Sequence, residues 1–138
     1  MLKIQRSTLG SILSNQGINM QNQDIQKFNS NGVMSAVTVF NQVAYLSGQV
    51  PKITTPDIAL QAKDVLNTID ALLAQVGTDK SRLLSAQVFV KNLEDFQIFN
   101  QIWIEWMEDS IPPSRATIQA DLVNPEWLIE IAVIAALK

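Results

Sequence analysis

The stretch from Pro112 to Lys138, PPSRATIQADLVNPEWLIEIAVIAALK, decides the fold of this chain, because it holds two strand-like runs with one unusual charge in each. Arg115 opens the first run, and Glu130 interrupts the apolar run LIEIAVIAAL. Burying a carboxylate in such a run costs free energy unless a partner stabilises the charge. The nature of that partner separates a structural interpretation of these residues from a functional one.

Composition limits the possible functions. The chain has 138 residues, of which 47% are hydrophobic and 17% charged, and this is typical of one folded domain. The net charge is −3, and the ten Lys and Arg residues form no basic stripe, so we expect no nucleic-acid partner. No run of about 18 apolar residues is present, so we expect no membrane span and a cytoplasmic protein.

The chain contains neither cysteine nor histidine. Disulfides, thiolate metal sites and catalytic centres built on Ser-His-Asp or Cys-His are therefore excluded, and we expect no metal and no cofactor. A general base must then be Asp, Glu, Lys or Tyr, or a water held by one of them. A carboxylate in an unusual place, such as Glu130, becomes a candidate for this general base.

The first half of the chain begins with residues 1–23, which are rich in Gln, Asn and Ser and are interpreted as a loosely structured arm that precedes a domain over 24–138. Asp24 to Phe28 are compatible with a short strand. The runs AVTVF and VAYLSGQV predict two strands joined by a tight turn at Asn41-Gln42. A helix follows, with Thr55 as its cap, Pro56 at its first position and Gly77 at its end.

The second half repeats this alternation. LLSAQVFV predicts a strand with Leu84, Ala86, Val88 and Val90 on one side, and a helix starting at Asn92 ends before Pro112. Strands are predicted over 115–123 and 128–137. The result is an α+β fold, a mixed sheet of five or six strands with two helices on one face. The other face keeps apolar residues, so we expect a second subunit to cover it.

The placement of Arg115 and Glu130 leaves two interpretations open. Alternation puts Arg115 and Thr117 on one side of their strand, and Ala116 and Ile118 on the other, against the helices. If the last two strands pair, Glu130 shares the polar side with Arg115. The two residues then form either a partly buried ion pair that fixes strand register, or a carboxylate clamp with a glutamate that orients water.

Several motifs, in order, resemble the reactive intermediate deaminases, the Rid or YjgF family. They are the YLSGQV strand, the helix beginning DFQIFN, Pro113-Ser114-Arg115, Leu122-Val123 and Ile129-Glu130-Ile131. The resemblance covers about residues 33–138. The segments NGVMSAVTVFN and QADLVNPEW are more similar to a branch of the family than to its archetypal deaminase.

The resemblance implies a chorismate-mutase-like fold and a homotrimer with ligand sites in the clefts between subunits. It implies hydrolysis of 2-imino acids, formed from enamines such as 2-aminoacrylate, to 2-keto acids and ammonia. Arg115 takes the position of the family's substrate-carboxylate arginine and Glu130 that of its water-orienting glutamate. Ser47, Gly48 and Asn100 match residues that line the family's site.

Two positions depart from the archetype. Met34 stands where the archetypal site has a tyrosine, and Thr117 stands where it has a cysteine. These changes alter the pocket wall and leave the clamp and the water-holding residue in place. An alternative function is therefore a trimer that binds or senses small carboxylates in the same cleft without turnover. A ribonuclease role, described for some relatives, is disfavoured by the acidic charge and the lack of histidine.

Overall fold

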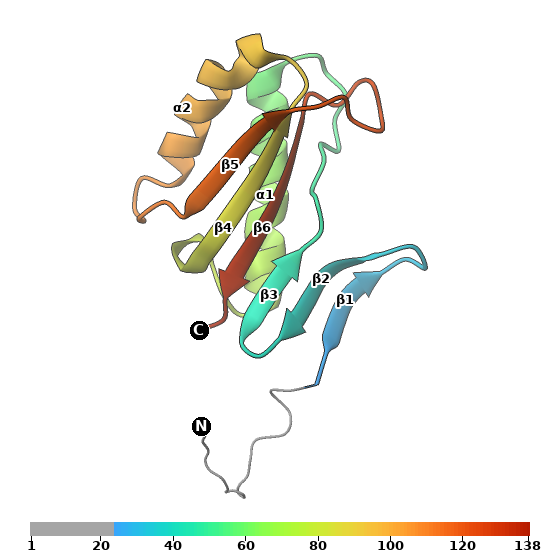
Figure 1. The fold of residues 1–138 in the computed structure, drawn as a ribbon, viewed down its shortest axis with the longest axis vertical. Coiled ribbons are helices and arrows are strands. Elements are labelled where there is room, and N and C mark those ends of the chain that lie inside the picture. The colour runs from blue at the N-terminus through green and yellow to red at the C-terminus, as the bar shows by residue number, and fades with distance from the viewer. Residues whose placement is uncertain (1–23) are drawn as a thin grey trace, which may run out of the picture.

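The computed structural model describes residues 24–138, so the prediction for residues 1–23 lies outside the described residues. The described chain forms one six-stranded mixed sheet with two α-helices, as the sequence predicts (Figure 1). The sheet order is β1-β2-β3-β6-β4-β5. The elements are β1 Gln26–Ser30, β2 Ser35–Phe40, β3 Val43–Leu46, α1 Ile58–Gln75, β4 Leu83–Val90, α2 Phe96–Trp106, β5 Ser114–Gln119 and β6 Ile129–Ala136, with short 3-10 turns at Lys80–Arg82 and Leu93–Asp95.

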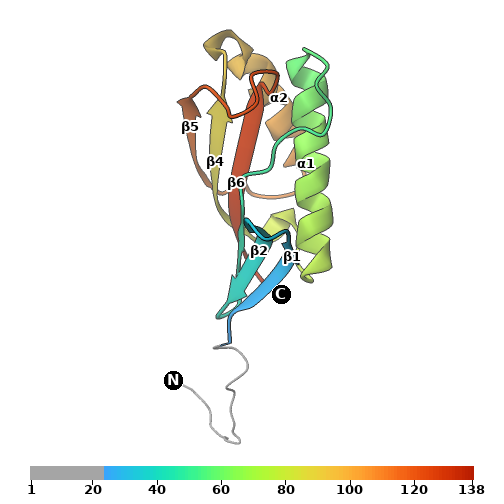
Figure 2. The ribbon, with the colours of Figure 1, turned by 90° about the vertical axis from the view of Figure 1, so that its right-hand side faces the viewer.

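Both helices lie on the same side of the sheet, which leaves the opposite side uncovered (Figure 2). The core lies between these layers. Alternate residues of the strands, among them Val37, Val88 and Ile131, pack with Ile69 of α1 and Phe99 of α2, and all are fully buried. We call the other side of the sheet the open face. No helix within residues 24–138 is long and apolar enough to cross a membrane.

Local sequence explains most element ends. Asn41 and Gln42 have φ values of 52° and 66°, the left-handed conformation of the predicted two-residue turn. Gly77, with φ of 80°, follows the last turn of α1 as predicted. The predicted cap at Thr55 is wrong: Asp57 caps α1, and its side chain accepts a hydrogen bond from the Leu60 amide at 3.1 Å. Aspartate is the stronger cap because it adds a negative charge at the positive end of the helix dipole.

The last two strands do not pair, because β4 lies between them, so the condition for Arg115 and Glu130 to share a side is not met. β5 runs parallel to β4, and β6 pairs antiparallel with both β4 and β3. The segment from β4 to β5 is a crossover through α2, and such a connection returns the chain parallel to the strand it left. β5 therefore forms the edge of the sheet, next to α2 (Figure 1).

The assignment of faces on β5 must be corrected as well. Arg115 is in register with Ala86, and Thr117 with Val88, and both of these β4 residues are buried in the core. Arg115 and Thr117 thus point to the helix side, whereas Ala116 and Ile118, predicted to face the helices, lie on the open face. Ile118 is 49% exposed. Leu84 also departs from its predicted side, because a bulge between Leu83 and Ser85 turns it outward.

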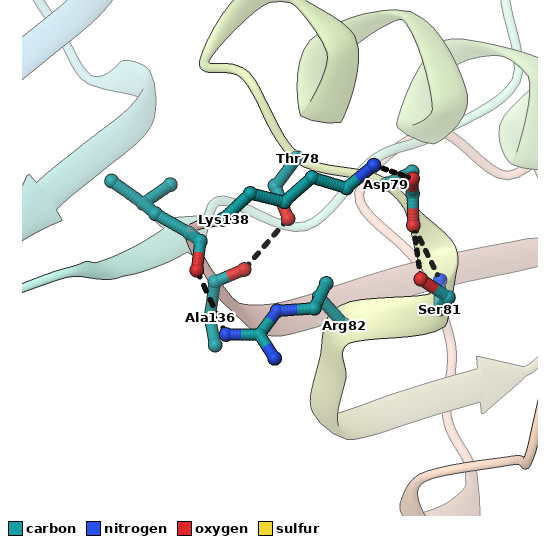
Figure 3. Close-up of polar contacts among 7 residues, drawn as sticks. Thr78, Asp79, Ser81, Arg82, Ala136 and Lys138 are labelled. Atoms are coloured by element: carbon teal, nitrogen blue, oxygen red, sulfur yellow. Dashed lines mark hydrogen bonds and ion pairs between the residues drawn. The ribbon is translucent and has the colours of Figure 1, made fainter.

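The end of the chain is fastened to the loop between α1 and β4 (Figure 3). The Thr78 hydroxyl donates a hydrogen bond to the Ala136 carbonyl at 2.6 Å, and the Arg82 guanidinium donates one to the Leu137 carbonyl at 2.9 Å. Lys138 forms an ion pair with Asp79 at 2.6 Å. Hydrogen bonds from Lys138 and Ser81 to the Asp79 carboxylate lower its pKa to about 2.

This pKa gives a pH dependence with a definite sign. The contribution of the Asp79 charge to stability is present above pH 3.8 and is lost as the pH falls through about 2. Because the pair is exposed, Asp79→Asn should lower the Tm at neutral pH by only about 1–3 °C. Thermal unfolding followed by circular dichroism from pH 7 to pH 2 tests this. A difference in Tm that persists unchanged at pH 2 would contradict the assignment.

Candidate functional site

Arg115 lies near the start of edge strand β5 and reaches toward α2. Its Nη2 atom donates a hydrogen bond to Oδ1 of Asn100 at 2.8 Å. The guanidinium lies over three aromatic rings, with its carbon 5.9, 5.5 and 5.2 Å from the centroids of Phe96, Phe99 and Trp103. Rings at this range attract a cation and hold its plane in place. We call Arg115, Asn100 and the neighbouring Thr117 the clamp half-site.

The charge of Arg115 is not neutralised by a carboxylate. Within residues 24–138 the guanidinium forms no ion pair, and Asn100 is its one hydrogen-bond partner. Partial burial lowers the pKa of Arg115, although a guanidinium stays charged at neutral pH. A half-buried cation without a counter-charge is costly, and most of its N–H donors remain available. The arrangement suits an incoming planar anion, such as a carboxylate.

Glu130 lies on the open face, close to the end of β3. Glu130 is half-buried, and a Cβ placed on Gly48 would lie 2.0 Å from its Oε2 atom, so the carboxylate occupies the space that a side chain at residue 48 would need. Next to Gly48, the Ser47 hydroxyl and carbonyl accept hydrogen bonds from Nε2 of Gln49 at 3.2 and 2.9 Å. We call Ser47, Gly48 and Glu130 the carboxylate half-site.

The backbone around Glu130 is fixed, whereas its side chain is not engaged. Gln49 and Ile131 exchange two backbone hydrogen bonds of 2.8 and 3.0 Å, and Glu130 itself is in register with Phe89 of β4. Among the described residues, the Glu130 carboxylate accepts no hydrogen bond and forms no ion pair. Such a carboxylate is available to bind water or to accept a proton.

The two half-sites do not meet within one chain. Arg115 is in register with Ala86 of β4, and through it with Val133 of β6, on the helix side, while Glu130 lies three residues before Val133 and on the opposite face. Strand spacing and rise per residue place their Cα atoms about 14 Å apart. The structural interpretation, an Arg115–Glu130 pair that fixes register, is therefore wrong for the single chain.

Met34 lies in the β1–β2 connection, on the side of the carboxylate half-site. Extending the β2–β3 register from Val37 and Leu46 places Met34 across from the segment just after Gly48. Its amide and that of Val33 are held by the Asn31 side chain at 2.9 Å. Met34 is 55% exposed. It can therefore contribute an apolar surface to a ligand that approaches Glu130.

Sequence reasoning missed two groups of residues. The rings of Phe96, Phe99 and Trp103, which the sequence motifs do not mark as part of a site, support the Arg115 guanidinium. Their three- and four-residue spacing around Asn100 puts them on the same helical surface, and this was the available signal. Gln49 follows Ser47-Gly48 directly, but no sequence pattern indicates that its side chain bonds to Ser47.

Comparison with known proteins identifies the family. Residues 24–137 match the family described as Endoribonuclease L-PSP. A RutC family protein of Haemophilus influenzae is 44% identical over 112 residues, which cover 80% of this chain and 97% of the relative. The RutC family protein YoaB of Escherichia coli is 36% identical over 102 residues, 74% of this chain and 89% of the relative. The chain therefore belongs to the L-PSP family, also named YjgF or Rid.

Solved structures agree with this assignment. A YjgF family protein from Neisseria meningitidis, 33% identical, superposes with a TM-score of 0.81 over 85% of this chain and 98% of its own. The Rid family protein YyfA from Yersinia pestis, 32% identical, has a TM-score of 0.75 over 78% of this chain and 90% of its own. The six-stranded sheet with two helices is thus the chorismate-mutase-like fold of this family.

The contact between Gly48 and Glu130 gives a test of the carboxylate half-site. Gly48 does not have a positive φ, so its backbone accepts alanine, and the three heavy atoms nearest to the added Cβ all belong to the Glu130 side chain. Gly48→Ala should fold but lose about 1–3 kcal/mol of stability through overpacking. In a Glu130→Ala background the same change should cost little. Denaturant unfolding of the four proteins measures this coupling, and an equal loss in both backgrounds would contradict the contact.

Proposed function

We propose that this protein hydrolyses reactive 2-imino acids to 2-keto acids and ammonia. The observation that carries the proposal is a half-buried Arg115 that has no carboxylate partner among residues 24–138. Membership of the Rid family supports the same chemistry. The motif resemblance assigns Arg115 and Glu130 to the family's carboxylate-binding and water-orienting positions. The proposal requires no metal or cofactor.

Arg115 binds the substrate carboxylate. A guanidinium presents parallel N–H donors that match both oxygens of a carboxylate, and the hydrogen bond to Asn100 with the three rings beneath restricts its orientation. Binding also supplies the missing counter-charge. The 2-imino acid is thereby held by its non-reacting end, with its C2 atom directed toward the second half-site.

Glu130 activates water. In a protonated 2-imino acid the carbon of the C=N bond is already electrophilic, so the water oxygen attacks it while Glu130 accepts a water proton. The product of this step is a carbinolamine. Glu130 then returns the proton to the nitrogen, the C–N bond breaks with its electron pair on the leaving ammonia, and Glu130 takes the proton of the carbinolamine hydroxyl as the C=O bond forms. This last proton passes to the ammonia, so one water is consumed, and one 2-keto acid and one ammonium ion are released from the protonated imine.

The site requires two copies of the chain, because the clamp and carboxylate half-sites lie on opposite sides of one sheet. The open face offers an interface: a hollow of about 500 Å³ is lined by apolar side chains such as Tyr45, Ala132 and Ile134 together with Ser85 and Gln87. Half-exposed apolar residues on an uncovered sheet favour association. We propose a homotrimer, as the family resemblance implies, with Arg115 of one subunit opposite Glu130 of the next.

Two alternative functions are an endoribonuclease and a trimer that binds small carboxylates without turnover. The family's description names an endoribonuclease, but a net charge of −3 and the absence of histidine disfavour this role. A trimer that only binds small carboxylates uses the same clamp and differs in turnover. An assay that generates iminopyruvate enzymatically and follows ammonia release separates them. Release above the spontaneous rate, lost in Arg115→Ala, supports hydrolysis; pyruvate binding without such release identifies a binder.

Arg115 substitutions test the clamp through binding alone. Charged hydrogen bonds contribute about 1.5–3 kcal/mol each, so Arg115→Ala should weaken pyruvate binding at least tenfold. Arg115→Lys should restore only part of the affinity, because an ammonium lacks the planar fork. Isothermal titration calorimetry of the three proteins measures this. Equal affinity of wild type and Arg115→Ala for pyruvate would rule out the clamp.

Glu130→Gln tests the role of the glutamate in the reaction. Loss of general-base assistance should lower kcat by about 10²–10⁴. Pyruvate affinity should stay near that of wild type, because Arg115 is unchanged. The Tm should change little, since the Glu130 carboxylate has no polar partner among the described residues. Turnover and melting measured on one sample decide the point; a large loss of stability with normal activity per folded protein would contradict it.

A further inference from the structure

Among the described residues, two polar side chains are buried in the fold, and they hold opposite ends of β6. Thr78, 5% exposed, bonds to Ala136 at the last residue of the strand. Gln61 of α1 is 0% exposed and reaches the residues that enter the strand. Only the end held by Gln61 lies next to Glu130. A change at Thr78 can therefore serve as a control for a change at Gln61.

The hydrogen bonds of Gln61 are complete. Its Oε1 atom accepts from the Leu128 amide at 2.8 Å, and its Nε2 atom donates to the carbonyls of Thr55 and Glu126 at 2.8 and 3.1 Å. Because the partners are backbone groups of fixed polarity, only one orientation of the side-chain amide satisfies all three. A fully bonded amide in a dry environment restricts the position of each segment it contacts.

These segments flank the carboxylate half-site. Leu128 is two residues before Glu130, and its carbonyl accepts a hydrogen bond from the Lys91 amide at 3.0 Å. Ile131, one residue after Glu130, is held by Gln49. The strand is thus fixed on both sides of the glutamate, with Gln61 supplying the anchor on the entering side. Thr55, the other partner, lies in the connection that leaves Gly48 and Gln49 and leads to α1.

We infer that Gln61 is a positioning residue that sets the location of the Glu130 carboxylate. It acts through Leu128 and Glu126, and it contacts no substrate itself. This inference rests on the proposed function for its kinetic consequence, although the structural consequence can be measured without turnover. Gln61 places the water-activating carboxylate against Gly48, so loosening the anchor moves Glu130 and leaves the clamp at Arg115 unchanged.

The test compares Gln61→Met with Thr78→Val. Both changes keep side-chain size nearly constant and remove buried hydrogen bonds to β6 or its entrance, but at opposite ends of the strand. In Gln61→Met, kcat should fall at least tenfold while the Kd for pyruvate stays within about twofold of wild type. In Thr78→Val, kcat per folded protein should stay within about twofold even if the Tm falls. Should Gln61→Met fail to fold, Gln61→Glu, which keeps an acceptor for the Leu128 amide, takes its place.

Amide hydrogen exchange gives a readout that does not depend on activity. Gln61→Met should accelerate exchange in residues 126–131 relative to residues 133–136, and Thr78→Val should do the reverse. An unchanged exchange pattern in Gln61→Met, or an equal fall of kcat in both variants, would overturn the positioning role. If wild type hydrolyses no imino acid, the proposed function fails, while the exchange pattern still decides whether Gln61 positions this segment.

Discussion

The insertion of β4 between β5 and β6 is the constraint on which the rest of this structure depends. It separates Arg115 from Glu130, and the register of the three strands places their side chains on opposite sides of the sheet. A single chain therefore leaves a half-buried cation without a counter-charge and a carboxylate without a polar partner among residues 24–138. Neither feature stabilises the fold, and both suit a site that a ligand and a second copy complete.

The supports around each half-site fit this view. The guanidinium is held by one hydrogen bond and three aromatic rings, all from α2. At the carboxylate half-site, Gly48 leaves the space that the Glu130 carboxylate occupies, and the backbone is fixed by hydrogen bonds on both sides of Glu130. Rigid secondary structure thus presents both functional groups, while their charged ends remain available. The polar bonds buried in the core, from Gln61 and Thr78, are used to fix β6 rather than α2.

The sequence was sufficient for the fold class, whereas the roles of the candidate residues Arg115 and Glu130 stay a prediction. The hairpin at Asn41-Gln42, the end of α1 at Gly77 and the α+β order follow from local patterns, because turn conformations and hydrophobic periods are set by neighbouring residues. Strand adjacency was not predictable in this way. Arg115 and Glu130 are only 15 positions apart in sequence, which suggests that their strands form a hairpin. Instead, β5 pairs with β4 on one side and β6 pairs with β4 on the other side. The sides of Ala116 and Ile118 were not predictable either, because they depend on the register of β5 with β4.

Inter-subunit complementation tests most directly whether the site is shared between copies. Arg115→Ala and Glu130→Gln are co-expressed with different tags, and mixed assemblies carrying both tags are purified and assayed on a 2-imino acid. Each variant alone should be inactive. If Arg115 of one subunit faces Glu130 of the next, each mixed trimer should have both residues intact in one of its three sites, so activity should recover to about a third of the wild-type value. Mixed assemblies as inactive as either parent would contradict a site built from two copies of this chain.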